Sequence, residues 1–421
     1  MSIHLLRHRP IGRAVTAVTA GLLAVAVPTL TAAPSATAAP PSGPQELQAA
    51  LDGVVAAGAT GVSLRVDDGH RTVRLASGAA QLEPRVPLRP DARLRVGSIT
   101  KSFVATVTLQ LVGEGRLSLD DTVERWQPGL IPNGADITVR QLLNHTSGIF
   151  NYTDDEPFIQ SLYAEPLRAR TPQELVAVAT AHPPVFAPGT SWSYSNTNYI
   201  VVGLILERVT HRSVLSLLRQ RIFQPLRLHD TVYPTRSPNI PGYHAHGYLP
   251  PSLSDAVPPP WGGQNRYVDI SVYSPTWAGA AGALISNPDD LRRFYRALLS
   301  GRLLRPAQLA EMKTMVELDP GFGYGLGLYT IQTPCGRIWG HDGGVPGYAT
   351  FAWNDESGRR GFVAGLPTAQ DEAIGEALET LLLAAVCRAF GQPVPSATAA
   401  ASTATLPRLD RSLPAARTGL G

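Results

Sequence analysis

Ser98 and Lys101 are the two residues whose types and spacing point most directly to chemistry. They are the first and last residues of the tetrapeptide Ser-Ile-Thr-Lys at positions 98–101. Residues three apart on a helix lie on the same face, so a hydroxyl and an amine would meet there. A serine becomes a nucleophile when a neighbouring base takes its proton. Lysine can be that base, because burial can hold its amine neutral, whereas arginine stays protonated.

The scarcity of lysine strengthens this interpretation. Lys101 and Lys313 are the only lysines among 36 basic residues, so the chain supplies its positive charge almost entirely as arginine. A residue that the chain otherwise avoids, placed one helical turn after a serine, favours a chemical role. A serine that only caps the helix, followed by a solvated lysine, is the alternative.

A second candidate element is Tyr194-Ser195-Asn196, which follows the turn-forming text Pro-Gly-Thr at 188–190 and precedes an apolar helix. A tyrosine hydroxyl can carry a proton between nucleophile and leaving group. An asparagine amide can donate to a substrate carbonyl and accept from its N–H group. Helix capping by Asn196 with Tyr194 as a packing residue is the alternative.

A third element is His341-Asp342-Gly343-Gly344, which lies between two predicted strands. The glycines allow another backbone or a ligand to approach closely, and the strand could offer its N–H groups to a substrate. His341 adds a polar or cationic group beside the amine. A structural histidine is the alternative.

In this order the three elements resemble the penicillin-binding protein and serine β-lactamase superfamily, whose first motif is S-x-x-K. Tyr-x-Asn in the second motif and His-x-Gly in the third are most similar to the class C-like branch, and there to soluble exported D-alanyl-D-alanine carboxypeptidases. The similarity extends from about 45 to 390 and includes the text at 93–98, 138–141, 193–198, 280–282 and 324–328.

The resemblance implies an acyl-enzyme route in which Ser98 attacks the penultimate D-Ala carbonyl, Lys101 and Tyr194 move the protons, and water releases the acyl group. Whether Lys101 or Tyr194 takes the serine proton stays open, because the two would titrate as a coupled pair. Backbone N–H groups of Ser98 and Gly344 would form the oxyanion hole. The substrate-binding residues that the resemblance implies are Asn196, His341, Gly343, Gly344 and Trp277.

The sequence departs from these carboxypeptidases where they would bind a free carboxylate. They carry threonines after the histidine and an arginine after the Gly-Leu-Gly-Leu text, whereas this chain has Asp342, Gly344 and Tyr329. Losing those donors and gaining an acid should weaken carboxylate recognition, because a hydrogen bond to a charged group contributes about 1.5–3 kcal/mol. A β-lactamase-fold esterase or D-aminopeptidase is therefore the alternative function, and a non-catalytic penicillin- or wall-binding protein is a further one.

The elements that must position these residues indicate an α/β (α+β) fold. Alternating residues at 61–66 and 71–76 predict two strands around a turn, and 98–112 predicts a buried helix. Strand-like runs at 323–331, 336–341, 347–354 and 361–366 precede a last helix at 371–390. We therefore expect an antiparallel sheet flanked by N- and C-terminal helices, with an inserted, mostly helical domain.

The predicted organisation has four parts. A signal peptide covers 1–38, the catalytic domain 39–115 and 276–391, the helical insertion 116–275, and a disordered tail 392–421. Three arginines, an apolar run and the small residues Ala-Thr-Ala at 36–38 are typical of a secretory leader. No later run is long enough to cross a membrane. We therefore expect a secreted protein, not held to the membrane after signal cleavage, and a monomer.

Composition and motifs argue against nucleic-acid binding, metal or cofactor chemistry and the α/β-hydrolase class. Without the leader the chain has equal numbers of basic and acidic residues, so nothing indicates nucleic-acid binding. Neither a cofactor nor a metal is expected, because His244 and His246 have no carboxylate at ligand spacing. No G-x-S-x-G elbow supports an α/β-hydrolase. The resemblance, in turn, implies the partners, which are a small peptide or a peptidoglycan stem peptide as substrate and β-lactams as inhibitors.

Cys335 and Cys387 are the two cysteines of the chain. In an oxidising compartment one disulfide is the simplest arrangement for an even pair, with two buried thiols as the alternative. The resemblance also implies this pairing.

Overall fold

The computed structural model describes residues 43–254 and 265–394. The predicted signal peptide and nearly all of the predicted tail lie outside these residues. Among the described residues, no helix combines the length and the apolar character that a membrane span requires.

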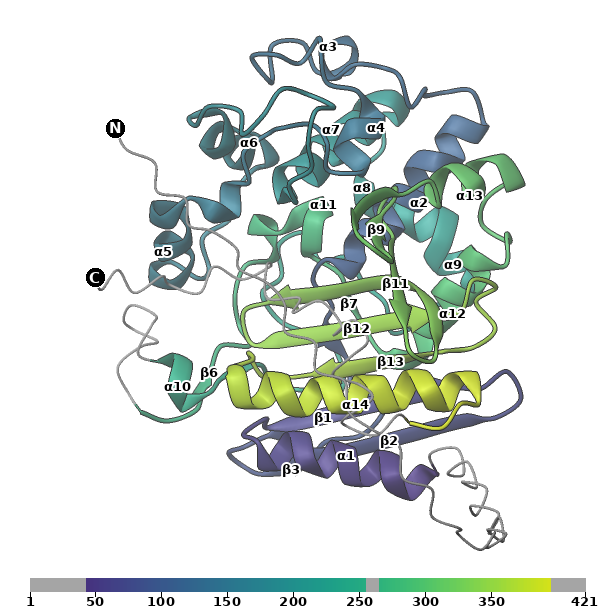
Figure 1. The fold of residues 1–421 in the computed structure, drawn as a ribbon. Coiled ribbons are helices and arrows are strands. Elements are labelled where there is room, and N and C mark those ends of the chain that lie inside the picture. The colour runs from purple at the N-terminus through teal and green to yellow at the C-terminus, as the bar shows by residue number, and fades with distance from the viewer. Residues whose placement is uncertain (1–42, 255–264, 395–421) are drawn as a thin grey trace, which may run out of the picture. The chain divides into compact units, whose positions relative to one another are not determined.

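A nine-stranded antiparallel sheet forms the centre of the described region, in the order β3-β2-β1-β13-β12-β11-β10-β9-β8 (Figure 1). Its strands are β1 (Gly61–Asp67), β2 (Thr72–Gln81), β3 (Val86–Pro87), β8 (Val316–Asp319), β9 (Phe322–Tyr324), β10 (Tyr329–Thr333), β11 (Gly336–Val345), β12 (Tyr348–Asn354) and β13 (Gly361–Leu366). β1 pairs with β13, with Ser63 opposite Gly365. The sheet is therefore completed from the far end of the chain, as predicted.

Two helices from opposite ends of the described region cover one face of the sheet. α1 (Pro44–Ala56) and α14 (Glu372–Phe390) pack side by side there (Figure 1). Leu47 and Leu51 of α1 and Leu378 of α14 are among the buried residues of this layer. A disulfide joins Cys335, in the turn before β11, to Cys387 of α14. The predicted fold class is confirmed, with terminal helices on an antiparallel sheet.

The other face carries α2 (Ile99–Gly113) and a larger helical layer, and its buried residues form a second core. The remaining helices are α3 (Val123–Trp126), α4 (Val139–Leu143), α5 (Glu156–Ala164), α6 (Pro172–Thr180), α7 (Asn196–Thr210), α8 (Val214–Leu218), α9 (Gln224–Leu226), α10 (Pro251–Ser254), α11 (Gly279–Gly282), α12 (Pro288–Leu299) and α13 (Pro306–Met312). Short turns of helix cover η1 (Tyr152–Asp154), η2 (Arg219–Phe223) and η3 (Pro275–Trp277), and short strand pairs are formed by β4 (Leu94–Arg95) with β7 (Ile285–Ser286) and by β5 (Tyr248–Leu249) with β6 (Val268–Asp269).

One expected strand is two strands in the structure. The pattern of 323–331 predicts a single strand, but β9 ends at Tyr324 and β10 begins at Tyr329. Between them the N–H group of Gly325 donates to the carbonyl of Leu328 at 2.8 Å, and Gly327 has a φ of +76°. A Cβ at Gly327 would lie 2.7 Å from the Cβ of Ala105 on α2. The chain therefore turns between β9 and β10, where α2 lies too close for a side chain at Gly327, although the apolar pattern of this run is that of a strand.

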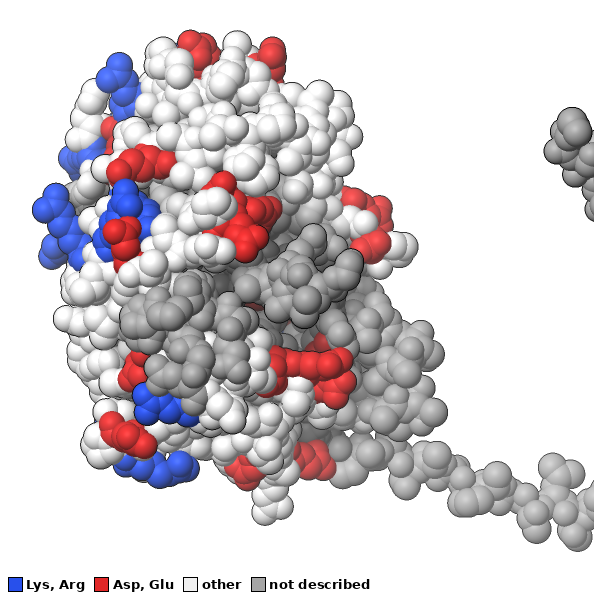
Figure 2. Space-filling model, turned by 90° about the vertical axis from the view of Figure 1, so that its left-hand side faces the viewer, with Lys and Arg blue, Asp and Glu red and all other residues white. Residues whose placement is uncertain are grey.

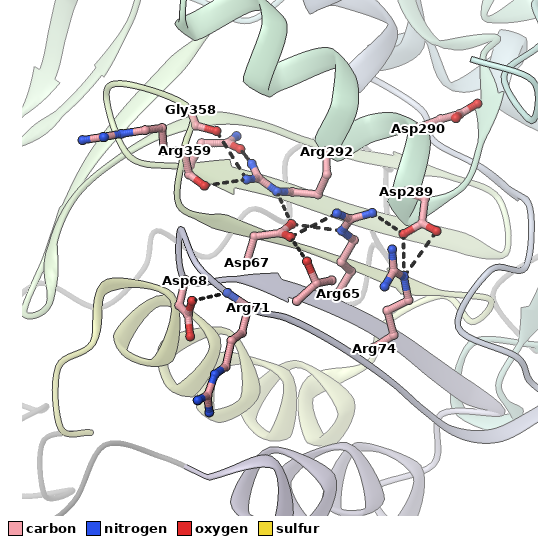
Figure 3. A network of polar contacts seen from close by, with 12 residues as sticks. Arg65, Asp67, Asp68, Arg71, Arg74, Asp289, Asp290, Arg292, Gly358 and Arg359 are labelled. Carbon is pink, nitrogen blue, oxygen red and sulfur yellow. Dashed lines mark hydrogen bonds and ion pairs between the residues drawn. The ribbon is translucent and has the colours of Figure 1, made fainter. Parts of the chain in front are cut away.

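A polar network fastens α12 to the sheet (Figure 3). Arg292 is only 3% exposed. Its guanidinium donates to a carboxylate oxygen of Asp67 on β1 at 2.8 Å. It also donates to the side chain of Asn354 and to the carbonyls of Gly358 and Arg359. This buried charge is thus paired and hydrogen-bonded, as burial requires.

Charged side chains on the surface are mixed in sign. On the described part of the face in Figure 2, acidic side chains are spread widely and the basic ones lie toward the left-hand side with acidic ones among them. That part of this face shows no large basic patch of the kind that would attract a polyanion.

Candidate functional site

The cavity that contains Ser98 has a volume of about 1070 Å³. Its lining residues come from the start of α2, the α4 region, the segment before α7, the strands β8 to β10 and the middle of β11. They are Ser98, Arg140, Gln141, Asn144, Thr146, Gly189, Thr190, Ser191, Trp192, Tyr194, Val316, Glu317, Leu318, Asp319, Phe322, Tyr329 and Asp342.

Ser98 and Lys101 meet at the start of α2, as their spacing predicts. The Ser98 side chain makes no capping hydrogen bond to the helix. Instead, the Lys101 amine lies 3.0 Å from the Ser98 hydroxyl oxygen. The amine also lies 2.7 Å from the side-chain oxygen of Asn196 and 2.8 Å from the carbonyl oxygen of Ala281. Lys101 is fully buried and Ser98 is 5% exposed.

The surroundings of Lys101 favour a neutral amine. Burial holds the pKa of Lys101 well below its ordinary value, and the carboxylate of Asp342 opposes this shift only in part. A neutral amine has two hydrogens, which match the two oxygens of Asn196 and Ala281. Its lone pair then remains for the Ser98 hydroxyl. This arrangement is the one that a general base for Ser98 requires.

Tyr194 lies over the same amine. The Lys101 nitrogen is 4.8 Å from the centre of the Tyr194 ring. The Tyr194 hydroxyl is buried and makes no hydrogen bond of good geometry with a described residue. Burial raises the pKa of Tyr194 well above its ordinary value, and the nearby Ser98 hydroxyl opposes the rise. Tyr194 therefore holds its proton and can donate it.

Asn196 is held on both sides of its amide. Its oxygen faces Lys101, and its nitrogen donates to the Thr153 hydroxyl at 3.0 Å. Its backbone N–H group donates to the side-chain oxygen of Asn151 at 2.9 Å. Ser195, not Asn196, occupies the N-cap position of α7. The amide of Asn196 is thus fixed between Lys101 and Thr153, and its nitrogen has a second N–H besides the one that donates to Thr153.

His341 is a neutral imidazole in this site. Its Nε2 accepts from the Tyr324 hydroxyl at 3.0 Å, and its Nδ1 donates to the backbone carbonyl of Asp342 at 2.5 Å. Burial, together with the nearby Lys101, lowers the pKa of His341 to about 3. The third motif therefore adds a polar group that carries no charge at neutral pH.

The glycines of the third motif bring β11 against the start of α2. A Cβ at Gly343 would lie 2.0 Å from the carbonyl oxygen of Val96 and 2.8 Å from the backbone nitrogen of Ser98. A Cβ at Gly97 would lie 2.8 Å from the backbone nitrogen of Gly344. Only glycine permits this approach, which places the backbone of the third motif beside Ser98.

Part of β11 has a free side next to this contact. β10 pairs with β11 only from Gly336 to Gly340. Within the residues that the structure describes, no strand pairs with the same side of the stretch from His341 to Val345. Backbone groups of that stretch can therefore bond to an extended ligand.

Of the predicted site residues, Ser98 and Tyr194 line the cavity. The others are absent from its lining, namely Lys101, Asn196, His341, Gly343, Gly344 and Trp277. Trp277 is 8% exposed and packs near Tyr273, and its carbonyl accepts from the Tyr152 hydroxyl at 2.6 Å. It is absent from the lining of the cavity that contains Ser98.

His244 and His246, the two histidines considered as metal ligands, form hydrogen bonds within the protein. His244 bonds through Nδ1 to the carbonyl of Gly242, and His246 bonds through Nδ1 to Asp269. In the described ranges, no group of three or more histidine, cysteine or acidic side chains could hold a metal ion.

His145 is a site residue that sequence reasoning missed. It is fully buried, has a φ of +65°, and accepts through Nδ1 from the N–H group of Ser195 and the amide of Asn198. Its ring lies 4.3 Å from that of Tyr194 and 4.8 Å from that of Tyr324, centre to centre. The text His-Thr-Ser-Gly at 145–148, a histidine beside turn residues after a helix, was the available signal.

Comparison with known proteins places the chain in a family. The family model described as Beta-lactamase matches residues 47–384. The chain is 29% identical to "Penicillin-binding protein 4*" of Bacillus subtilis (strain 168), with 79% of this chain and 73% of that protein covered.

Two solved structures are similar. A D-stereospecific amidohydrolase from Streptomyces sp. is 39% identical with a TM-score of 0.72, over 80% of this chain and 98% of that one. A D-amino acid amidase from Ochrobactrum anthropi SV3 is 31% identical with a TM-score of 0.69, over 78% and 92% respectively. The chain therefore belongs to the Beta-lactamase family and is a serine hydrolase related to the penicillin-binding proteins.

Proposed function

We propose that the protein hydrolyses amides of amino acids, of the D-series in particular, through an acyl-enzyme on Ser98. The contact of 3.0 Å between the Lys101 amine and the Ser98 hydroxyl, inside a fully buried cluster, carries this proposal. As the Ser98 oxygen bonds to the substrate carbonyl carbon, its proton passes to Lys101 and the carbonyl oxygen becomes an oxyanion. When the tetrahedral intermediate collapses, the C–N bond breaks and the leaving amine takes a proton.

We assign the proton donor to Tyr194 and the base to Lys101. Burial favours the neutral form of both groups, which is the basic form of lysine and the acidic form of tyrosine. Tyr194 can thus protonate the leaving nitrogen while Lys101 returns a proton to Tyr194. Water then attacks the ester carbonyl, the Ser98–acyl bond breaks, and Ser98 regains its proton.

The oxyanion would be bound by the N–H groups of Ser98 and Gly344. The close approach of Gly343 to the backbone nitrogen of Ser98 supports this assignment. In water-excluded sites such donors stabilise the transition state more than they stabilise the substrate. The free side of β11 would bind the substrate backbone, and the remaining N–H of Asn196 would donate to it.

The charge of the cavity favours an amine-bearing substrate over one with a free carboxylate. Among the lining residues the acids are Glu317, Asp319 and Asp342, and the single base is Arg140. Arg140 already pairs with Glu311 at 2.6 Å. Tyr329 stacks on Phe322 where the carboxypeptidases carry an arginine. The names of the two similar structures support the same substrate class.

D-alanyl-D-alanine carboxypeptidase activity on cell-wall peptides, the first expectation from the sequence resemblance, is the second candidate here. The similarity to the Bacillus subtilis penicillin-binding protein supports it. The leader-like sequence and the disulfide support export to an oxidising compartment for either activity.

A substrate comparison tests the proposal. D-Phenylalanine amide, p-nitrophenyl acetate and diacetyl-L-lysyl-D-Ala-D-Ala are incubated with the full chain and with Ser98→Ala. We expect the highest kcat/KM for the amide and no turnover by Ser98→Ala. A higher kcat/KM for the diacetyl peptide would make carboxypeptidase the function, and a higher one for the ester would make it an esterase.

A labelling experiment tests the nucleophile separately. We expect a fluorescent penicillin to attach to Ser98 and to leave Ser98→Ala unlabelled. An intact mass that stays unchanged after long exposure would contradict the assignment of Ser98.

A further inference from the structure

Asp342 differs from the other acids of the cavity in its burial. Glu317 and Asp319 lie on β8 and are exposed to solvent. Asp342 is only 8% exposed and lies on β11, directly after His341. A buried carboxylate interacts more strongly with a charged ligand than a solvent-exposed one does, because the protein interior has a lower dielectric constant than water. Asp342 is therefore the acid of this cavity with most influence on a bound substrate.

Among the residues that the structure describes, the carboxylate of Asp342 has no charged cationic partner. Among the described residues the single ion-pair contact is with Nδ1 of His341, at 3.6 Å. That imidazole is neutral, since burial lowers its pKa. No lysine or arginine in the described ranges forms an ion pair with Asp342, although Lys101 lies close enough to influence its pKa. Burial raises the pKa of Asp342 to about 7, and a buried carboxylate of this kind gains most from a cation that arrives with the ligand.

The place of Asp342 along the strand fits the position of a substrate amine. It lies two residues before Gly344, on the stretch of β11 that has no partner on its β10 side. Its side chain lines the same cavity as Ser98. In an α-amino acid amide the amino group is one carbon from the carbonyl that Ser98 attacks, so both groups must lie in this cavity together. The aromatic residues Trp192 and Tyr329 also line this cavity.

We propose that the Asp342 carboxylate binds the free α-ammonium group of the substrate, so that the enzyme selects amino acid derivatives with an unblocked amino terminus. This inference rests on the proposed amide hydrolase function and names the group that the site recognises. Acylation of the substrate nitrogen would remove the charge and leave the carboxylate without a partner.

Two substrates that differ only in the amino group test the proposal. D-Phenylalanine p-nitroanilide carries the ammonium group, and 3-phenylpropanoyl p-nitroanilide lacks it. We expect the kcat/KM ratio of the first to the second to fall about 10- to 100-fold in Asp342→Asn, the loss of one charged hydrogen bond. Asp136→Asn is the matched control, because it removes an exposed acid that lies outside the cavity lining and should leave the ratio within about twofold.

Inhibition of the unaltered protein gives a second measurement that does not depend on the folding of a variant. D-Phenylalaninol should inhibit at least about 10-fold more strongly than 3-phenylpropan-1-ol, which lacks the amino group. Equal inhibition by both compounds would overturn the proposal.

The outcomes separate this inference from the function on which it rests. If Asp342→Asn slows both anilides by the same factor, Asp342 acts through Lys101 or His341 and the ammonium site is wrong, while the hydrolase function stands. If the unaltered protein hydrolyses neither anilide but releases D-Ala from diacetyl-L-lysyl-D-Ala-D-Ala, both the amide function and the ammonium site are wrong.

Discussion

The imidazole of His145 lies against the phenol ring of Tyr194, with 4.3 Å between the ring centres and 34° between their planes. Nδ1 of His145 accepts from the Ser195 N–H group at 3.2 Å and from the Asn198 amide at 3.1 Å. The histidine therefore joins the ring that faces Lys101 to the beginning of α7. It does not line the cavity that contains Ser98, so it acts on the chemistry through Tyr194 and is a positioning residue.

His145→Asn should slow acylation. Asparagine tolerates the positive φ of this position but cannot replace the ring that supports Tyr194. We expect kcat to fall about 10- to 100-fold, part of the full effect of a general acid, with a smaller change in KM. Single-turnover labelling by a fluorescent penicillin measures the step. His182→Asn is the control, because His182 also stacks on an aromatic ring, but that ring is Phe150 and not Tyr194. An unchanged kcat would contradict the positioning role.

Lys101→Met should abolish most of the activity. Methionine fills a similar volume without an amine, so kcat should fall about 10²- to 10⁴-fold, the usual contribution of a general base. Lys313→Met is the matched control, because Lys313 is the other lysine of the chain and lies outside the cavity lining. Initial rates with D-phenylalanine amide measure both. Comparable losses of kcat in the two variants would indicate a general effect of removing a lysine and would contradict the role of Lys101 as the base.

Activity should rise with pH, and Asp342→Asn should move that rise to lower pH. The base works in its neutral form, so kcat/KM increases as pH passes through the pKa of Lys101. The Asp342 carboxylate stabilises the lysine cation and raises that pKa, and burial lowers it. Removing the carboxylate therefore lowers the pKa further. The profile is measured with 3-phenylpropanoyl p-nitroanilide, which has no amine for Asp342 to bind. A shift of the kcat/KM profile of Asp342→Asn to higher pH would contradict the prediction that Asp342 raises the pKa of Lys101.

Gly343→Ala should damage both stability and activity. Its Cβ would lie 2.0 Å from the carbonyl oxygen of Val96, so β11 or the start of α2 must move. We expect a loss of about 3 kcal/mol or more in the free energy of unfolding. Gly375→Ala, inside α14 with nothing within 4 Å of the added Cβ, is the control and should gain about 0.5–1 kcal/mol. Urea unfolding measures both, and equal stability of the two variants would refute the close contact.

Local pattern was enough to predict most elements of the fold. The turn residues after Val66 separate β1 from β2, and the fourfold apolar spacing in 98–112 matches α2. The break between β9 and β10 was not predictable, because the apolar pattern of 323–331 continues through it. At that turn Gly327 lies too close to Ala105 of α2 to carry a side chain, and this approach joins two residues that are far apart in the sequence.

One contact of the candidate site follows from the sequence. Ser98 and Lys101 meet as their spacing predicts, whereas the contact of Asn196 with the Lys101 amine was not predicted, and the catalytic and binding roles of these residues stay predictions. The carbonyl of Ala281 and the hydroxyl of Thr153 could not be foreseen, because a backbone carbonyl carries no sequence signal and threonines are common. Only the folded chain brings them to the amine and to the amide.

The near absence of lysine makes the site open to direct spectroscopy. Lysine labelled with ¹³C at the ε position would give two resonances from the whole chain, one from Lys101 and one from Lys313. The Lys313 amine donates to the carbonyl of Glu356 and is partly solvated, so its resonance serves as an internal reference. The ionisation of the buried amine could then be followed in the resting enzyme, before and after a ligand enters, without any turnover.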